Sequence, residues 1–239
     1  MTMRRRVATG RAVAALRRAR SETGAGGGGD GDVSAEQCEM CARPAGQHHP
    51  HVVDLESREL LCTCRPCSYL FVAEGAAAGR YRAVPERYLS FGDFTLDQAR
   101  WDALQIPVGM AFFFTNSRLG RTVAFYPGPA GATESELPLE AWQEVVDDNP
   151  ALGGAAPDVE AILVAAPGAR SPMASGHDDR FACFLVPIDT CYELVGHLRS
   201  TWRGFDGGQE VRDRLETFFA DLRRRSRPAP PAHSHRGSA

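Results

Sequence analysis

Five cysteines within thirty residues are the strongest constraint on this chain. Cys38 and Cys41 form one CxxC pair, Cys64 and Cys67 form a second, and 22 residues separate the two pairs. Two thiolates three positions apart can point at one ion from a tight turn, and two such turns supply a tetrahedron of ligands. We therefore predict a metal site on these four cysteines, with zinc favoured and iron or an Fe–S cluster as the alternative.

Cys62 is the fifth cysteine of this region. Side chains of an extended strand alternate between its two faces, so Cys62 and Cys64 are expected on the same face. This would place Cys62 beside the ion as a small buried hydrophobe, a labile thiol or an alternative ligand. His48, His49 and His51 lie nearby. They could replace a cysteine or donate to a thiolate, or they could be exposed loop residues.

The segment between the two CxxC pairs resembles a β-hairpin. Val52 and Val53 favour a strand, Glu56-Ser57 can form a turn, and 59–62 can return as a second strand. A hairpin of this size buries little core, and a structural metal would supply the missing folding free energy. The region is therefore predicted to be a zinc-ribbon-like unit.

The remaining sequence predicts an α+β domain with antiparallel strands and two C-terminal helices. The stretches "GMAFFFTNS" and "RTVAFY" predict a hairpin, and "DVEAILVAAP" and "FACFLVPI" predict two further strands. A helix with Thr95 as its N-cap is expected over "TLDQARWDAL", and another over "LPLEAWQEVVDDNP". The predicted organisation is an Arg/Gly-rich disordered tail at 1–33, the cysteine unit at 36–72, the α+β domain at 80–225, and a disordered tail at 226–239.

Composition excludes several classes of function. The net charge of the 239-residue chain is only -3, which gives no support for nucleic-acid binding. No apolar run is long enough to span a bilayer. The chain has no lysine, so mechanisms that need a Schiff-base or P-loop lysine are excluded. An odd number of cysteines, close CxxC spacing and no secretory signal favour a reducing cytoplasm over a disulfide framework.

No catalytic constellation emerges from the residues, so a non-enzymatic role is favoured. Cys183 could act as a nucleophile with His177, Asp178 or Asp179, but it alternates within an apolar strand as a core residue does. Cys191 lies on the apolar stripe of a helix and is also expected in the core. The segment "WRGFDGG" is either a helix C-cap turn or a protein-recognition loop. The partner-binding candidates in it are Trp202, Arg203, Gly204, Gly207 and Gly208.

Two segments, "CEMCARPAGQHHPHVVDLESRELLCTCRPCSYLF" and "CFLVPIDTCYELVGHLRSTWRGFDGGQEV", carry a family resemblance. Together they resemble an uncharacterised actinobacterial family of unknown function whose genes tend to lie in nickel–iron hydrogenase clusters. The resemblance covers about 36–225 and excludes both tails. It implies a context and not an activity, since the family has no assigned catalytic residue. We therefore expect a metal-binding accessory protein with hydrogenase subunits or maturation factors as partners; the alternative is an iron-thiolate or Fe–S electron-transfer protein.

Overall fold

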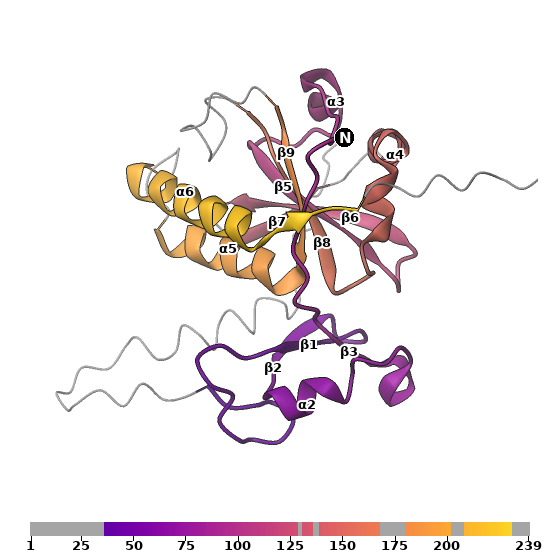
Figure 1. Cartoon of the computed structure of the whole chain (residues 1–239), viewed down its shortest axis with the longest axis vertical. Helices are drawn as coiled ribbons and strands as arrows, with labels where there is room; N and C mark the ends of the chain where they lie inside the picture. The colour runs from indigo at the N-terminus through magenta and orange to yellow at the C-terminus, as the bar shows by residue number, and fades with distance from the viewer. Residues whose placement is uncertain (1–35, 129–130, 136–138, 168–179, 202–207, 231–239) are drawn as a thin grey trace, which may run out of the picture. The chain divides into compact units, whose positions relative to one another are not determined.

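The structure is a computed structural model that describes residues 36–128, 131–135, 139–167, 180–201 and 208–230 (Figure 1). The chain separates into two compact units, Met1–Val84 and Pro85–Ala239. The 1–33 segment expected to be a disordered tail lies outside the described residues. Among the described helices, none combines the length and apolarity that a bilayer crossing requires.

The cysteine-containing unit is built on a three-stranded antiparallel sheet of order β2-β1-β3. Its elements are β1 (His51–Asp54), β2 (Glu59–Cys62), α2 (Arg65–Tyr69), η1 (Ala76–Gly79) and β3 (Tyr81–Ala83). The hairpin expected between the two CxxC pairs is therefore present. The third strand pairs Val52 with Ala83, so the sheet of this unit extends into the 80–225 segment that was predicted to form the second domain.

A buried carboxylate closes the hairpin of this unit. Asp54 is 4 % exposed, and its Oδ1 accepts the backbone N–H groups of Glu56 and Ser57 at 2.9 and 3.3 Å. Arg80 donates to its Oδ2 from Nε and Nη2 at 3.1 and 2.7 Å. Burial raises the pKa of Asp54, but the hydrogen bonds from Arg80 and the two backbone N–H groups outweigh burial and lower the pKa.

The second unit is built on a seven-stranded sheet of order β10-β4-β9-β8-β5-β6-β7, antiparallel except for the β10–β4 pair. Its strands are β4 (Leu89–Ser90), β5 (Met110–Asn116), β6 (Arg121–Gly128), β7 (Gly131–Ser135), β8 (Glu160–Ala165), β9 (Ala182–Pro187) and β10 (Arg227–Pro228). Its helices are α3 (Gln98–Ala103), α4 (Leu139–Asp148), η2 (Pro150–Gly154), α5 (Ile188–Thr201) and α6 (Gly208–Arg225). The predicted α+β class, with antiparallel strands and two C-terminal helices, is confirmed.

Helices cover both faces of this sheet, which explains the continuous apolar character of its central strands (Figure 1). On one face Phe113 stacks on Trp142 of α4, with ring centroids 3.8 Å apart and planes 6° from parallel. On the other face the neighbouring Phe112 contacts Tyr192 of α5, at a centroid distance of 6.3 Å. Consecutive residues of β5 are therefore both buried, because each face of the strand meets a helix layer.

One helix start differs from the sequence-based expectation. The N-cap of α3 is Asp97, whose Oδ1 accepts the backbone N–H of Arg100 at 2.8 Å. The assignment of Thr95 as N-cap is wrong. Its backbone N–H donates to Asn149 Oδ1 at 2.8 Å, so this residue joins two segments instead of starting the helix.

Candidate metal centre

The four cysteines of the two CxxC pairs converge in the first unit. The sulfur atoms of Cys38, Cys41, Cys64 and Cys67 all lie within 4.8 Å of one another, and this group could hold a metal ion. The Cys41 and Cys64 sulfurs are 3.7 Å apart. A tetrahedral Zn–S bond of about 2.3 Å gives an edge of about 3.8 Å between sulfurs, whereas a disulfide requires about 2.05 Å. The separation therefore fits thiolates around one ion and excludes a disulfide.

A tight turn presents the first pair. The backbone N–H of Cys38 donates to the Arg43 carbonyl at 2.7 Å, and the N–H of Ala42 donates to the Cys38 carbonyl at 2.7 Å. Ala42 has a φ of 59°, in the left-handed region that only glycine enters without steric cost. The turn reverses the chain within six residues, so that Cys38 and Cys41 face the same point.

The start of a short helix presents the second pair. Cys64 is the N-cap of α2, with φ −73° and ψ 156°, and Pro66 occupies the first turn. Proline suits this position because the first helical N–H groups have no partner within the helix. Cys67 lies one turn further along, so Cys64 and Cys67 can point in the same direction.

The electrostatics of the group favour a bound cation. Burial raises the pKa of Cys38, but hydrogen bonds from the backbone N–H groups of Cys64, Met40 and Cys41 and from the Cys41 thiol lower the pKa to about 6. Hydrogen bonds with the thiols of Cys64 and Cys41, together with burial and the charge on Cys38, raise the pKa of Cys67 to about 12. The lowered pKa favours the thiolate form of Cys38, whereas ionisation of Cys67 requires a neighbouring positive charge.

Cys62 does not join this group. The ligand atoms of Cys62, His49 and His51 lie within 4.8 Å of one another and form a second group. The expectation that Cys62 shares a face with Cys64 does not apply, because β2 ends at Cys62 and the chain then turns into the N-cap of α2. His48, the third histidine of the region, is exposed.

The signal for this second group was present in the sequence. A turn centred on Glu56-Ser57 pairs residues whose numbers sum to 113, and His51 and Cys62 are such a pair. Opposed residues in an antiparallel ladder have adjacent side chains. Combining the predicted turn with this register would have placed the thiol beside the imidazole.

Comparison with known proteins gives a family but no activity. A family model described as a family of unknown function (DUF5947) matches residues 37–226. The chain belongs to the DUF5947 family. No curated protein and no solved structure matches it.

The other cysteines of this DUF5947 chain belong to the core, as predicted. Cys183 and Cys191 are 3 % and 0 % exposed. Burial raises the pKa of each thiol well above its usual value, and the charge on Asp189 adds to this effect for Cys191. A buried protonated thiol is a poor nucleophile. His177, Asp178 and Asp179, considered as partners of Cys183, lie outside the described residues.

The partner-binding segment of the DUF5947 chain is mostly outside the described residues as well. This holds for Trp202, Arg203, Gly204 and Gly207, and Gly208 begins α6. Their predicted role in protein recognition stays a prediction.

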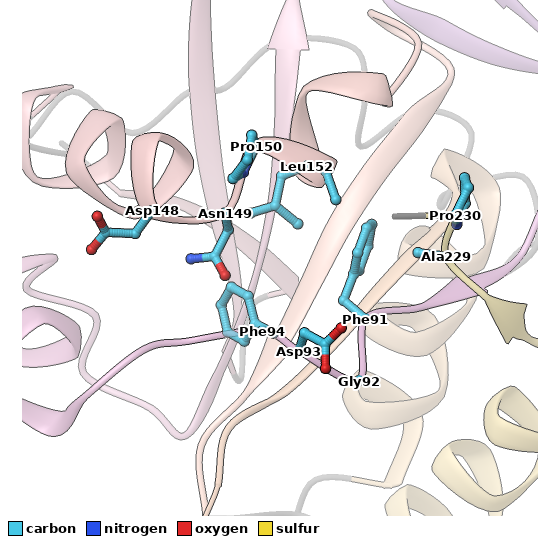
Figure 2. Close-up of a pocket in the computed structure, with 11 residues that line it drawn as sticks. Phe91, Gly92, Asp93, Phe94, Asp148, Asn149, Pro150, Leu152, Ala229 and Pro230 are labelled. Atoms are coloured by element: carbon cyan, nitrogen blue, oxygen red, sulfur yellow. The ribbon is translucent and has the colours of Figure 1, made fainter. Parts of the chain in front are cut away.

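A pocket of about 310 Å³ lies in the second unit (Figure 2). Phe91, Phe94 and Leu152 supply apolar walls. The side chain of Asn149 already makes hydrogen bonds within the fold, since its Nδ2 donates to the carbonyls of Thr95 and Val145 at 2.9 and 2.8 Å. Asp148 pairs with Arg100. These polar groups maintain local structure, and the strongest candidate site of the DUF5947 chain is the four-thiol group.

Proposed function

We propose that this protein binds one zinc ion through Cys38, Cys41, Cys64 and Cys67 and acts as an accessory factor through protein–protein contacts. The convergence of the four sulfur atoms within 4.8 Å carries the proposal. Four cysteines around zinc leave no open coordination position, which is typical of structural sites and not of catalytic ones. The ion would therefore hold the unit in shape, and the unit would present a surface to a partner.

Exposed apolar side chains close in sequence to the second CxxC pair support the contact role. Shortly after Cys67, the side chains of Tyr69, Leu70 and Val72 are 65 %, 67 % and 66 % exposed. Large apolar side chains at this exposure are favoured as anchors in a protein interface. Because α2 and the second pair share a backbone, loss of the ion would also displace these side chains. We propose that they insert into an apolar surface of the partner protein.

The partner that we propose is a component of hydrogenase, or of a related metalloenzyme, during its assembly. This part of the proposal rests on the family resemblance, and the cytoplasm is the compartment that it implies. The tagged full-length protein should recover a hydrogenase subunit or maturation factor from native lysate, identified by mass spectrometry. Repeated recovery of no such component would overturn the proposal.

A matched pair of surface variants tests the contact itself. Leu70→Ser should reduce recovery of the identified component, because it removes an apolar anchor beside the metal unit. Leu119 is also a large exposed hydrophobic residue, at 48 %, but it lies in the turn between β5 and β6 of the other unit. Leu119→Ser should leave recovery unchanged. Equal recovery by both variants would remove Leu70 from the contact.

The second candidate function is electron transfer by iron on the same four thiolates. The backbone N–H groups of Cys64, Met40 and Cys41 that lower the pKa of Cys38 favour it, since N–H···S hydrogen bonds also tune the reduction potential of iron–thiolate sites. Metal analysis with a visible absorption spectrum on anaerobically purified protein separates the two functions. Stoichiometric zinc in a colourless protein supports the accessory role, and a coloured iron protein supports electron transfer.

A further inference from the structure

The ligand atoms of His49, His51 and Cys62 lie close together in the cysteine unit. They form a group separate from the four thiols. His51 on β1 and Cys62 on β2 are directly opposed. The adjacent Thr63 N–H donates to the Pro50 carbonyl at 3.0 Å, so the His51–Cys62 pair is of the non-hydrogen-bonded type, in which side chains approach most closely. His49 completes the group, with its ring centroid 4.9 Å from that of His51.

His49 is oriented as metal-ligating histidines are. Its side chain is 6 % exposed, and its Nδ1 lies 2.9 Å from the Gly46 carbonyl oxygen and 3.3 Å from Glu36 Oε2. Both neighbours are acceptors, so Nδ1 carries the proton and Nε2 is left with its lone pair. A carbonyl or carboxylate on the second nitrogen is the usual arrangement around a histidine that binds metal through the first.

The Nε2 atom of His49 is therefore left as an acceptor without a hydrogen bond to the described part of the chain. It is buried and has no hydrogen-bond partner among the described residues. A buried acceptor without a partner is costly, and such groups in folded proteins usually have an ion or another partner. One ring nitrogen of His49, one of His51 and the Cys62 sulfur all lie within 4.8 Å of one another. An imidazole with an unused lone pair therefore lies beside a second imidazole and a thiol.

The thiol of this group is also held in place. The N–H of Cys62 donates to Glu39 Oε2 at 2.8 Å, and the N–H of Glu39 donates to the Cys62 carbonyl at 2.8 Å. Glu39 lies between Cys38 and Cys41, so the first CxxC turn supports the strand end that carries Cys62. Formation of the four-thiol site would thereby position one ligand of the other group.

We propose that His49 Nε2, His51 and the Cys62 thiolate form a second metal site, for a borderline-soft divalent cation of the zinc and nickel type. Two imidazoles and one thiolate are the donors that such ions prefer. No fourth side chain joins this group among the described residues. His51 and Cys62 are partly exposed, so solvent or an external ligand can reach the remaining coordination position. Binding releases the thiol proton of Cys62 to solvent.

The two sites differ in the chemistry they permit. Four thiolates close the coordination sphere of a tetrahedral ion, whereas three protein ligands leave an exchangeable position, as in catalytic zinc sites. The second ion would exchange more readily and could bind an external ligand. This inference concerns residues that the proposed accessory function does not use.

Metal titration of the full-length protein tests the second site. Anaerobic, metal-free protein is titrated with Co²⁺, and the bound Co²⁺ is then displaced by Zn²⁺ or by Ni²⁺ in separate arms. We expect two equivalents of Co²⁺ per chain, the weaker of which shows the absorption of an ion with one thiolate. Displacement of Co²⁺ by either ion fits the donor set. The ion that displaces it at the lower concentration is the preferred metal. A wild type that binds a single equivalent, with the four-thiolate spectrum alone, would overturn the proposal.

Three ligand variants and one neighbour assign the second equivalent. His49→Ala, His51→Ala and Cys62→Ser should each bind one equivalent and keep the four-thiolate spectrum, which also shows that the variant is folded. Exposed His48, adjacent to His49, is the matched control, and His48→Ala should bind two equivalents. Two equivalents bound by Cys62→Ser, or one by His48→Ala, would contradict the proposed ligand set.

Failure of this inference is distinguishable from failure of the proposed function. Loss of the four-thiolate spectrum with retention of the single-thiolate ion would remove the zinc accessory site and leave the second site in place. The reverse result would remove the second site alone.

Discussion

The two units of the chain obtain their stability in different ways. The buried hydrophobic residues of the cysteine unit are Cys38, Val52, Val53, Cys64 and Val84, and two of these are candidate ligands. The second unit buries every fully buried aromatic residue of the described chain, in layers on both faces of a seven-stranded sheet. Because its core is small, we expect the cysteine unit to depend on a bound metal for its stability, whereas the second unit does not.

Metal removal is expected to give the largest difference in stability between the two units. A structural zinc contributes about 10 kcal/mol or more to folding, which exceeds what three buried valines can supply. We expect chelation under reducing conditions to abolish the hydrogen-exchange protection of β1 while β8 keeps its protection. Unchanged protection of β1 after complete metal loss would show that the unit has a sufficient core of its own.

Removal of a core aromatic should affect the second unit alone. Phe113→Ala deletes a ring stacked on Trp142 and should lower the free energy of unfolding by about 3–5 kcal/mol. Metal content should not change. The exposed Thr115 of the same strand is the control, and Thr115→Ala should lie within about 0.5 kcal/mol of the wild type. Denaturant unfolding with metal analysis measures both, and metal loss by Phe113→Ala would show coupling between the units.

Asp54 makes a smaller, pH-dependent contribution to the cysteine unit. Its pKa is lowered in the folded state, so its contribution is present above the unfolded value of about 3.9 and is lost as the pH falls through the folded value. Asp54→Asn should destabilise the metal-loaded unit by about 1–3 kcal/mol at pH 7. Hydrogen exchange of β1 should show the gap between variant and wild type closing as the pH falls below about 3.9 and through the folded pKa.

A neighbouring acid provides the control for this pH dependence. Glu56 contacts Arg80 at 3.5 Å but is 57 % exposed. Glu56→Gln should change stability by less than about 1 kcal/mol, because solvent screens exposed pairs. A constant difference between Asp54→Asn and the wild type across the pH range would contradict the role of the buried charge.

The smallest expected effect is a gain in the first CxxC turn. Ala42 has a φ of 59°, and Ala42→Gly should stabilise the metal-loaded unit by up to about 1 kcal/mol. Ala45, in the same loop but without a positive φ, should respond with the opposite sign, and Ala45→Gly should cost about 0.4–1 kcal/mol. Metal-exchange half-lives resolve changes of this size, and a loss of stability in Ala42→Gly would show that the turn is not strained.

Local sequence patterns predicted individual helices and strands, but they did not predict pairings between distant segments. Val52 and Val53 indicated the hairpin, and the alternation around Cys183 indicated a core strand, because both signals depend on adjacent residues. The pairing of Arg227 with Leu89 depends on how the sheet closes, and no local pattern in the 226–239 segment reveals it.

The candidate site was predictable to a similar degree. The CxxC spacing identified the four cysteines. The expectation for Cys62 extended strand alternation across Thr63, although β2 ends at Cys62. Thr63 is 0 % exposed, and both its N–H and its hydroxyl bind the Pro50 carbonyl, at 3.0 and 2.9 Å. Beyond this contact the chain enters the N-cap of α2, and the two neighbouring thiols belong to different groups.

The two-residue strands β4 and β10 have a consequence for self-association. They cover the edge of the sheet beside β9, and β10 is held there by N–H groups of Arg227 and Ala229, which donate to the carbonyls of Tyr88 and Ser90 at 3.1 and 2.9 Å. Its Pro228 has no N–H to offer a further strand. An edge this short, which contains a proline, gives another copy of the sheet almost no template for pairing, and so limits fibril growth from this side of an apolar sheet.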